Sequence, residues 1–144
     1  MAMFKKLAIA VGIVSLLAIP VLAHHPFSTD FDWKQPVTVS GTITKVEWEN
    51  PHAHLYVDAK GADGNSVTWT FEMGNLNQLK QAGWKKDTLK LGDTVFIDAW
   101  MAKTKSNTGN VKSVRLYDGR ELSGASSIAD PNANEPKQKL SKLD

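Results

Sequence analysis

The sequence lacks cysteine, contains few aromatic residues and has nearly balanced charge. With no Cys among 144 residues, a disulfide scaffold is excluded. The 10 Gly and 6 Pro are too few for a collagen-like or disordered polymer, and 42% of the residues are hydrophobic, which is typical of a globular domain. The length suits one domain and excludes a multidomain enzyme.

The chain also lacks an apolar run long enough to span a bilayer, which needs about 20 residues. Its apolar run at residues 7–19 follows a lysine pair at positions 5–6 and ends before a proline. This pattern, with small residues before the cut, predicts a signal peptide over residues 1–23, cleaved between Ala23 and His24. A retained anchor is the alternative. Cleavage predicts a periplasmic or secreted protein without a stable membrane anchor.

Removal of the signal peptide also removes the excess of positive charge. The chain has 17 Lys and Arg against 15 Asp and Glu, and residues 1–23 contain two of the lysines and no acid, which leaves 15 against 15. A protein without a basic excess has no electrostatic footprint for nucleic acid. We therefore expect no nucleic-acid partner.

Apolar and polar residues alternate with a period of two from Val37 onward, which predicts a mainly β protein. In the first strand this alternation slips by one residue at Lys45, close to Gly41, which is typical of a bulge where a long strand bends. A period of three to four over residues 75–84 predicts one short helix with an Asn cap. The five expected strands cover residues 37–48, 52–59, 67–73, 94–102 and 111–117, with a Gly/Asn/Ser-rich loop at 106–110.

Three strands, a short helix and two further strands follow the order of a small five-stranded OB-like barrel. Another small barrel or a sandwich is the alternative. The polar composition after position 122 predicts a disordered tail. The expected organisation is therefore a signal peptide (1–23), an N-terminal segment (24–36), the OB-like domain (37–122) and the tail (123–144).

The four histidines form two pairs that suit metal binding. His24 and His25 would begin the mature chain, and His52 and His54 lie in the second strand. Residues two apart in a strand share a face, so two imidazoles can converge on one ion. Solvated polar positions are the alternative for both pairs.

An N-terminal histidine can chelate a metal through its α-amine and its own imidazole. A third nitrogen from another His would complete a T-shaped brace that suits Cu(II), and amine and imidazole nitrogens favour copper over Zn(II). In the alternative mode of metal binding, the ligands are the α-amine, a deprotonated backbone amide and the His25 imidazole. Pro26 has no N–H, so amide chelation cannot continue beyond His25.

Other side chains offer weaker candidates. Glu72 could lie near the metal, and Met73 and Met101, which could supply a thioether for Cu(I), are expected in the core. A stacking platform for a sugar or a base is the alternative to a core role for four aromatic residues. These residues are Trp48, Tyr56, Trp69 and Trp100.

Seven short motifs stand out, among them His24-His25-Pro26-Phe27, Asn50-Pro51-His52-Ala53-His54 and Phe71-Glu72-Met73-Gly74. Together they resemble a family of small exported bacterial proteins known only as a domain of unknown function. The resemblance covers residues 24–122 and implies a bacterial envelope protein, without an activity. It makes His24, His25 and His52 hallmark positions, whereas the position of His54 is often aromatic in the family, which favours His52. The motifs are His24-His25-Pro26-Phe27, the strand at 37–48, Asn50-Pro51-His52-Ala53-His54, Phe71-Glu72-Met73-Gly74, Gly83-Trp84, Gly92-Asp93 and Asp118-Gly119-Arg120.

These patterns favour a binding protein over an enzyme, with copper-dependent oxidation left as an alternative. We expect a periplasmic protein that binds copper, or alternatively zinc, for buffering or delivery in the envelope. Its metal ligands would be His24, His25, His52 and His54. The competing hypothesis is an OB-like module for an envelope protein or oligosaccharide, with its contact surface around Trp48, Tyr56 and residues 103–110.

Overall fold

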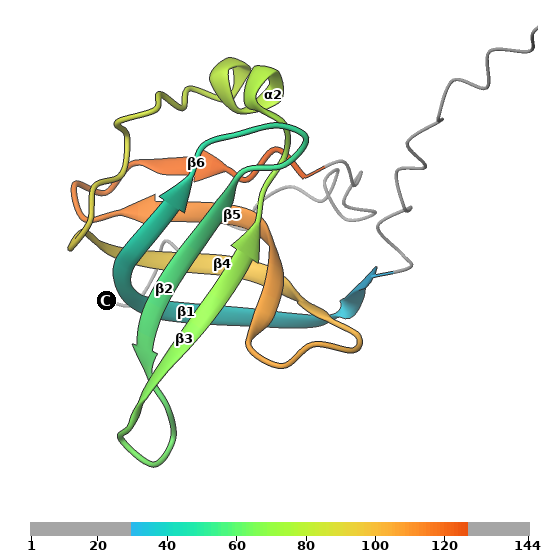
Figure 1. Cartoon of the computed structure of the whole chain (residues 1–144), viewed down its shortest axis with the longest axis vertical. Helices are drawn as coiled ribbons and strands as arrows, with labels where there is room; N and C mark the ends of the chain where they lie inside the picture. Colours follow the sequence, from blue (N-terminus) through green and yellow to red (C-terminus); the bar gives the residue numbers. More distant parts are fainter. Residues whose placement is uncertain (1–29, 127–144) are drawn as a thin grey trace, which may run out of the picture.

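The computed structural model describes residues 30–126, which form a mainly β structure with one short helix (Figure 1). The predicted signal peptide, His24, His25 and positions 127–144 lie outside the described residues. The strands are β1 (Phe31–Glu47), β2 (His54–Lys60), β3 (Ser66–Glu72), β4 (Thr94–Ala102), β5 (Thr108–Leu116) and β6 (Glu121–Ser123), and the helix is α2 (Leu76–Gln81).

The six strands form one sheet in the order β3-β2-β1-β4-β5-β6, with antiparallel neighbours throughout. A further parallel pairing joins β3 to β5, where Glu72 lies opposite Asn110. This pairing connects strands from distant parts of the sheet order, so the sheet is partly ring-like. The mainly β prediction with one helix between the third and fourth strands is confirmed.

The long strand β1 bends and pairs with two neighbouring strands (Figure 1). Its first part pairs with β4 and its last part with β2, and the register shifts between Ile43 and Lys45 at the predicted bulge. At Gly41 the strands approach so closely that a Cβ atom would lie 2.4 Å from the Asp58 carbonyl oxygen. Any side chain at this position would separate β1 from β2.

The core follows the alternation that the sequence predicts. In β2 and its approach, Ala53, Leu55, Val57 and Ala59 are buried, and the intervening residues are only partly covered. Phe71 and Met73 extend this layer from β3, where both are almost fully buried. The expectation that Met73 belongs to the core is therefore confirmed. The opposite face of β2 remains available for polar side chains, His54 among them, and His52 lies just before the strand.

The helix α2 is shorter than predicted but begins at the expected cap. The Asn75 side-chain oxygen accepts a hydrogen bond from the Gln78 backbone N–H at 2.9 Å, which satisfies one of the free donors of the first turn. Leu79 is the buried residue of the helix, and Trp84, after its end, is buried as well. The helix thereby covers one end of the sheet, opposite the β2–β3 turn (Figure 1).

The structure differs from the predicted elements near the end of the domain. β5 begins at Thr108, inside the expected loop at 106–110, because residues 108–110 pair with β3 and residues 109–110 pair with β4 as well. A sixth strand, β6, pairs with β5. Local composition cannot reveal such strands, because their partners supply the hydrogen bonds.

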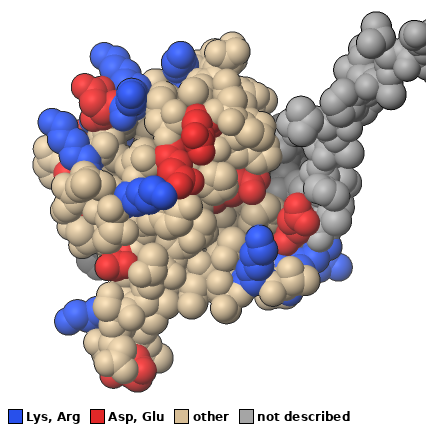
Figure 2. Space-filling view, in the orientation of Figure 1, with Lys and Arg blue, Asp and Glu red and all other residues tan. Residues whose placement is uncertain are grey.

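Charged side chains of both signs are interspersed on the face shown in Figure 2. Among the described residues, no helix has the length and apolar character needed to cross a membrane.

Candidate functional site

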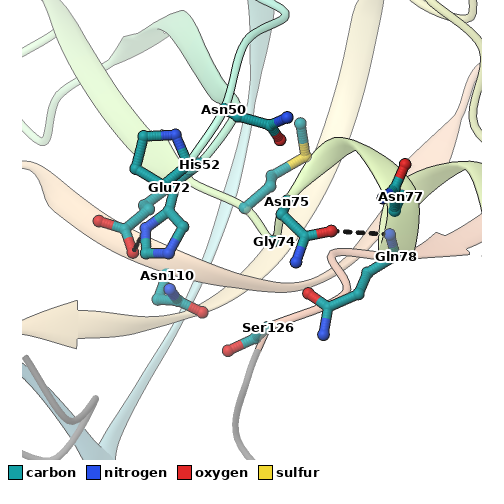
Figure 3. Close-up of a pocket in the computed structure, with 11 residues that line it drawn as sticks. Asn50, His52, Glu72, Gly74, Asn75, Asn77, Gln78, Asn110 and Ser126 are labelled. Atoms are coloured by element: carbon teal, nitrogen blue, oxygen red, sulfur yellow. Dashed lines mark hydrogen bonds and ion pairs between the residues drawn. The ribbon is translucent and has the colours of Figure 1, made fainter. Parts of the chain in front are cut away.

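A pocket of about 430 Å³ opens where α2 meets the ends of β2 and β3. Figure 3 shows His52 and Glu72 together on one side of it and Asn77 and Gln78 of α2 on the other. Elements far apart in the sequence therefore build the pocket. Its lining consists of Asn50, Pro51, His52, Glu72, Met73, Gly74, Asn75, Asn77, Gln78, Asn110 and Ser126.

His52 and Glu72 form a close pair at this pocket. The His52 Nδ1 atom lies 2.7 Å from Glu72 Oε1, and about one third of the His52 side chain is exposed. A carboxylate beside Nδ1 orients the ring and favours the tautomer in which Nε2 serves as a metal ligand. The pair thus has the arrangement that commonly supports a metal-binding histidine.

His54 has different surroundings, although it is only two residues away. Its Nδ1 lies 3.8 Å from Glu47 Oε2, and the same carboxylate accepts hydrogen bonds from Lys45 and from the Tyr56 hydroxyl. These hydrogen bonds, the one from Lys45 first, lower the pKa of Glu47. Partial desolvation and then the hydrogen bond to Glu47 raise the pKa of Tyr56. Glu47 is therefore shared among several partners.

His52, which lies just before β2, contacts a carboxylate of β3, and His54, the first residue of β2, lies near a carboxylate of β1. Within residues 30–126 there is no group of three or more His, Asp or Glu side chains placed to hold a metal. A metal site at His52 would thus need ligands from elsewhere, and the predicted ligands His24 and His25 lie outside the described residues.

Asn110 contributes an unusual buried polar group to the pocket. Asn110 is only 4% exposed, and its Oδ1 atom has no hydrogen-bond partner among residues 30–126. A buried carbonyl oxygen without a partner costs about 1–3 kcal/mol. The Ser126 hydroxyl, also part of the lining, is likewise buried without a partner. The pocket wall therefore contains unused hydrogen-bonding capacity.

Two other amide side chains fix the first turn of α2 beside the pocket. Asn50 Oδ1 accepts a hydrogen bond from the Leu76 N–H at 3.1 Å, and Asn75 Oδ1 accepts one from the Gln78 N–H. Both oxygens are thus engaged by the helix, and the corresponding NH₂ groups remain as donors. The Asn50 and Asn75 side chains thus stabilise the start of α2 through their oxygens, and their NH₂ groups can donate hydrogen bonds to a ligand.

Residues 123–126 pack against the domain, and Ser126 lines the pocket. The Gly124 N–H donates to the Lys112 carbonyl, and the Gly124 carbonyl accepts from the Gly74 N–H at 2.8 Å. The backbones are so close that a Cβ atom on Gly74 would lie 2.0 Å from the Ala125 carbonyl oxygen. This contact brings Ser126 to the pocket.

The four aromatic residues considered for a stacking platform occupy different environments. Trp48 and Trp69 are partly buried against the core, and Trp69 stacks on Phe71. Trp100 is 7% exposed. The Tyr56 ring lies beneath the Lys45 ammonium group, 4.9 Å from its centroid. Core packing therefore accounts for Trp48 and Trp69, whereas Trp100 is buried elsewhere, with the Lys112 ammonium group 5.9 Å from its ring centroid.

The sequence did not identify Asn110, Gln78 or Ser126 as site residues. The sequence predicts a loop at Asn110, whereas its pairing with both β3 and β4 buries it. The one available signal was a polar residue directly before the apolar Val111. Glu72, in contrast, had been considered as a neighbour of the metal.

Comparisons with known proteins agree with the resemblance seen in the motifs. No curated protein matches the sequence. A family model does match, over residues 11–112, which is well over half of the chain and includes His24, His25, His52, Glu72 and Asn110. The chain therefore belongs to DUF6152, a family of unknown function.

Proposed function

We propose that this protein is exported and binds a transition metal, Cu(II) in preference to Zn(II), for buffering or delivery in the envelope. The contact of 2.7 Å between His52 Nδ1 and Glu72 Oε1 carries this proposal. It orients His52 for coordination through Nε2, as carboxylate partners do for many metal-binding histidines. His52 is therefore the anchor of the proposed site.

The remaining ligands are proposed to come from the mature N-terminus. The described domain does not supply three ligands at one place, so His52 requires partners from outside it. Cleavage before His24 would provide an α-amine and an imidazole on one residue, and His25 would provide another imidazole. His54 is the fourth candidate and the weaker strand ligand, because Glu47 near it already accepts hydrogen bonds from Lys45 and Tyr56.

Copper titration of the processed protein tests the proposal. The protein would be isolated from a periplasmic extract, its start at His24 confirmed by mass, and Cu(II) binding followed by electron paramagnetic resonance. We expect one tightly bound equivalent with an axial spectrum dominated by nitrogen ligands. Competition with Zn(II) would measure the metal preference.

Two variants identify the ligands. His52→Ala and a chain with one extra residue before His24 should both lose tight copper binding. His54→Ala is the control for a histidine substitution nearby and should retain tight binding. Weak or multi-site binding by the unmodified protein would contradict the metal function. Retained binding in His52→Ala would contradict the assignment of the anchor.

The strand pairings also support a second proposal, an OB-like barrel that acts as a binding module. We infer closure in the order β1-β2-β3-β5-β4, because β3 pairs with β5 and β1 pairs with both β2 and β4. The helix between β3 and β4 agrees with this fold. Such a module would bind an envelope protein or an oligosaccharide, and Tyr56→Ala tests whether the surface around Tyr56 makes the contact.

A further inference from the structure

Most side chains that line the pocket beside α2 differ chemically from His52, the proposed metal ligand in its lining. Its lining contains five carboxamide side chains, and no Lys or Arg among residues 30–126 belongs to it. The carboxylate of Glu72 is held next to His52. An anionic ligand would therefore find no cationic partner other than a protonated histidine, and an apolar ligand would leave the amides unpaired. This composition favours a neutral, hydrogen-bonding ligand.

The hydrogen bonds already made within the pocket define what such a ligand must supply. On the α2 side, the oxygens of Asn50 and Asn75 are engaged by the helix, so their NH₂ groups are available as donors. On the β5 side, Asn110 Oδ1 is an acceptor without a partner. A matching ligand must both accept and donate hydrogen bonds at closely spaced positions.

The pocket walls argue against an extended peptide. Peptides that bind to sheets use a row of unpaired backbone groups at a strand edge. Here Glu72 is paired on both sides, with His54 of β2 and with Asn110 of β5. The wall therefore presents side chains and lacks a free backbone ladder at this point. Sugar hydroxyls, which donate and accept, suit carboxamide side chains directly.

We propose that this pocket binds a neutral sugar, whose hydroxyl groups form hydrogen bonds with the carboxamide side chains that line it. The volume of about 430 Å³ is within the range of small-molecule sites. This inference rests on the proposed binding-module function and is independent of metal binding. It places the ligand in the pocket and not on the surface around Tyr56.

Nuclear magnetic resonance titration of the metal-free processed protein tests this inference. Glucose, galactose, N-acetylglucosamine and maltose would be added in the presence of EDTA, with N-acetylated trialanine amide as the peptide probe. We expect at least one sugar to shift the amide signals of Asn110 and of the α2 residues Asn77 and Gln78. The peptide should leave these signals unchanged.

Variants locate the site. Asn110→Leu has similar volume but no polar group, and it should weaken sugar binding about tenfold. Gln78→Ala, on the exposed face of α2, tests the opposite wall without disturbing the core and should weaken binding as well. Asn65→Ala, in the β2–β3 turn, is the matched control and should bind normally.

Three results would overturn the inference. These are the absence of sugar-induced shifts, binding that is unaffected by both Asn110→Leu and Gln78→Ala, and peptide-induced shifts without sugar-induced ones. Sugar binding that depends on Tyr56 alone would reject the pocket while retaining the binding-module function. Copper binding is measured separately, so its loss or retention does not affect this test.

Discussion

His52 and His54 are the same residue type, two positions apart, yet the fold gives them different roles. His52 stands at a pocket with Glu72 2.7 Å from its Nδ1. His54 is 3.8 Å from Glu47, a carboxylate already occupied by Lys45 and Tyr56. Position along the chain creates this difference, since His52 lies just before β2 and contacts Glu72 at the end of β3, whereas His54 begins β2 and lies near Glu47 of β1. Spacing alone therefore does not define a metal site.

The largest effect is expected from removing His52. His52→Ala should weaken Cu(II) binding by more than about 100-fold, beyond the loss typical of removing only a ligand's hydrogen-bond partner. His54→Ala should change the affinity by no more than about fivefold, because it is placed as a weaker ligand. Competition titration of both variants with a chelator of known affinity measures the two constants. Equal losses would show that the two histidines act as one chelate and would remove the distinction between them.

Replacing the carboxylate partners sharpens the comparison. Glu72→Gln keeps the shape of the side chain but removes the charge beside His52, and it should weaken copper binding by about 10-fold or more. Glu47→Gln is the matched change beside His54 and should leave the affinity unchanged. Electron paramagnetic resonance would distinguish an altered nitrogen ligand from a lost one. If Glu47→Gln had the larger effect, His54 would be the anchor.

The buried oxygen of Asn110, a residue that lines the same pocket as His52, is expected to lower the stability of the folded protein. Asn110→Leu removes the buried oxygen that lacks a partner, so it should raise the free energy of unfolding by about 1 kcal/mol. Urea denaturation with circular dichroism measures this change. A decrease would mean that Asn110 is needed for packing between β3 and β4.

The smallest effect concerns the pH dependence of stability near His54. Hydrogen bonds from Lys45 and Tyr56 lower the pKa of Glu47 below its ordinary value of 4.5. The folded state therefore gains stability from this carboxylate above pH 4.5 and loses it as the pH falls through the lowered pKa. Glu47→Gln should slightly reduce the loss of stability between pH 6 and pH 3. Urea denaturation at both pH values, with Glu49→Gln as the exposed control, tests this expectation.

Much of the fold was predictable because burial on one face of a strand leaves a period of two. The alternation of Leu55, Val57 and their neighbours, the bulge near Lys45, the boundaries of β4 and the cap at Asn75 are all local patterns. β6 and the start of β5 were not predictable, because their hydrogen-bond partners lie in distant strands.

The sequence by itself determined the alternating core, the helix cap and His52 as a candidate ligand, because side-chain periodicity and type express them. Only the tertiary structure decided that Glu72 lies beside His52, that Glu47 lies near His54, and that Asn110 is buried at a pocket wall. Strand register sets these distances, and register depends on pairing between segments that are far apart in the chain.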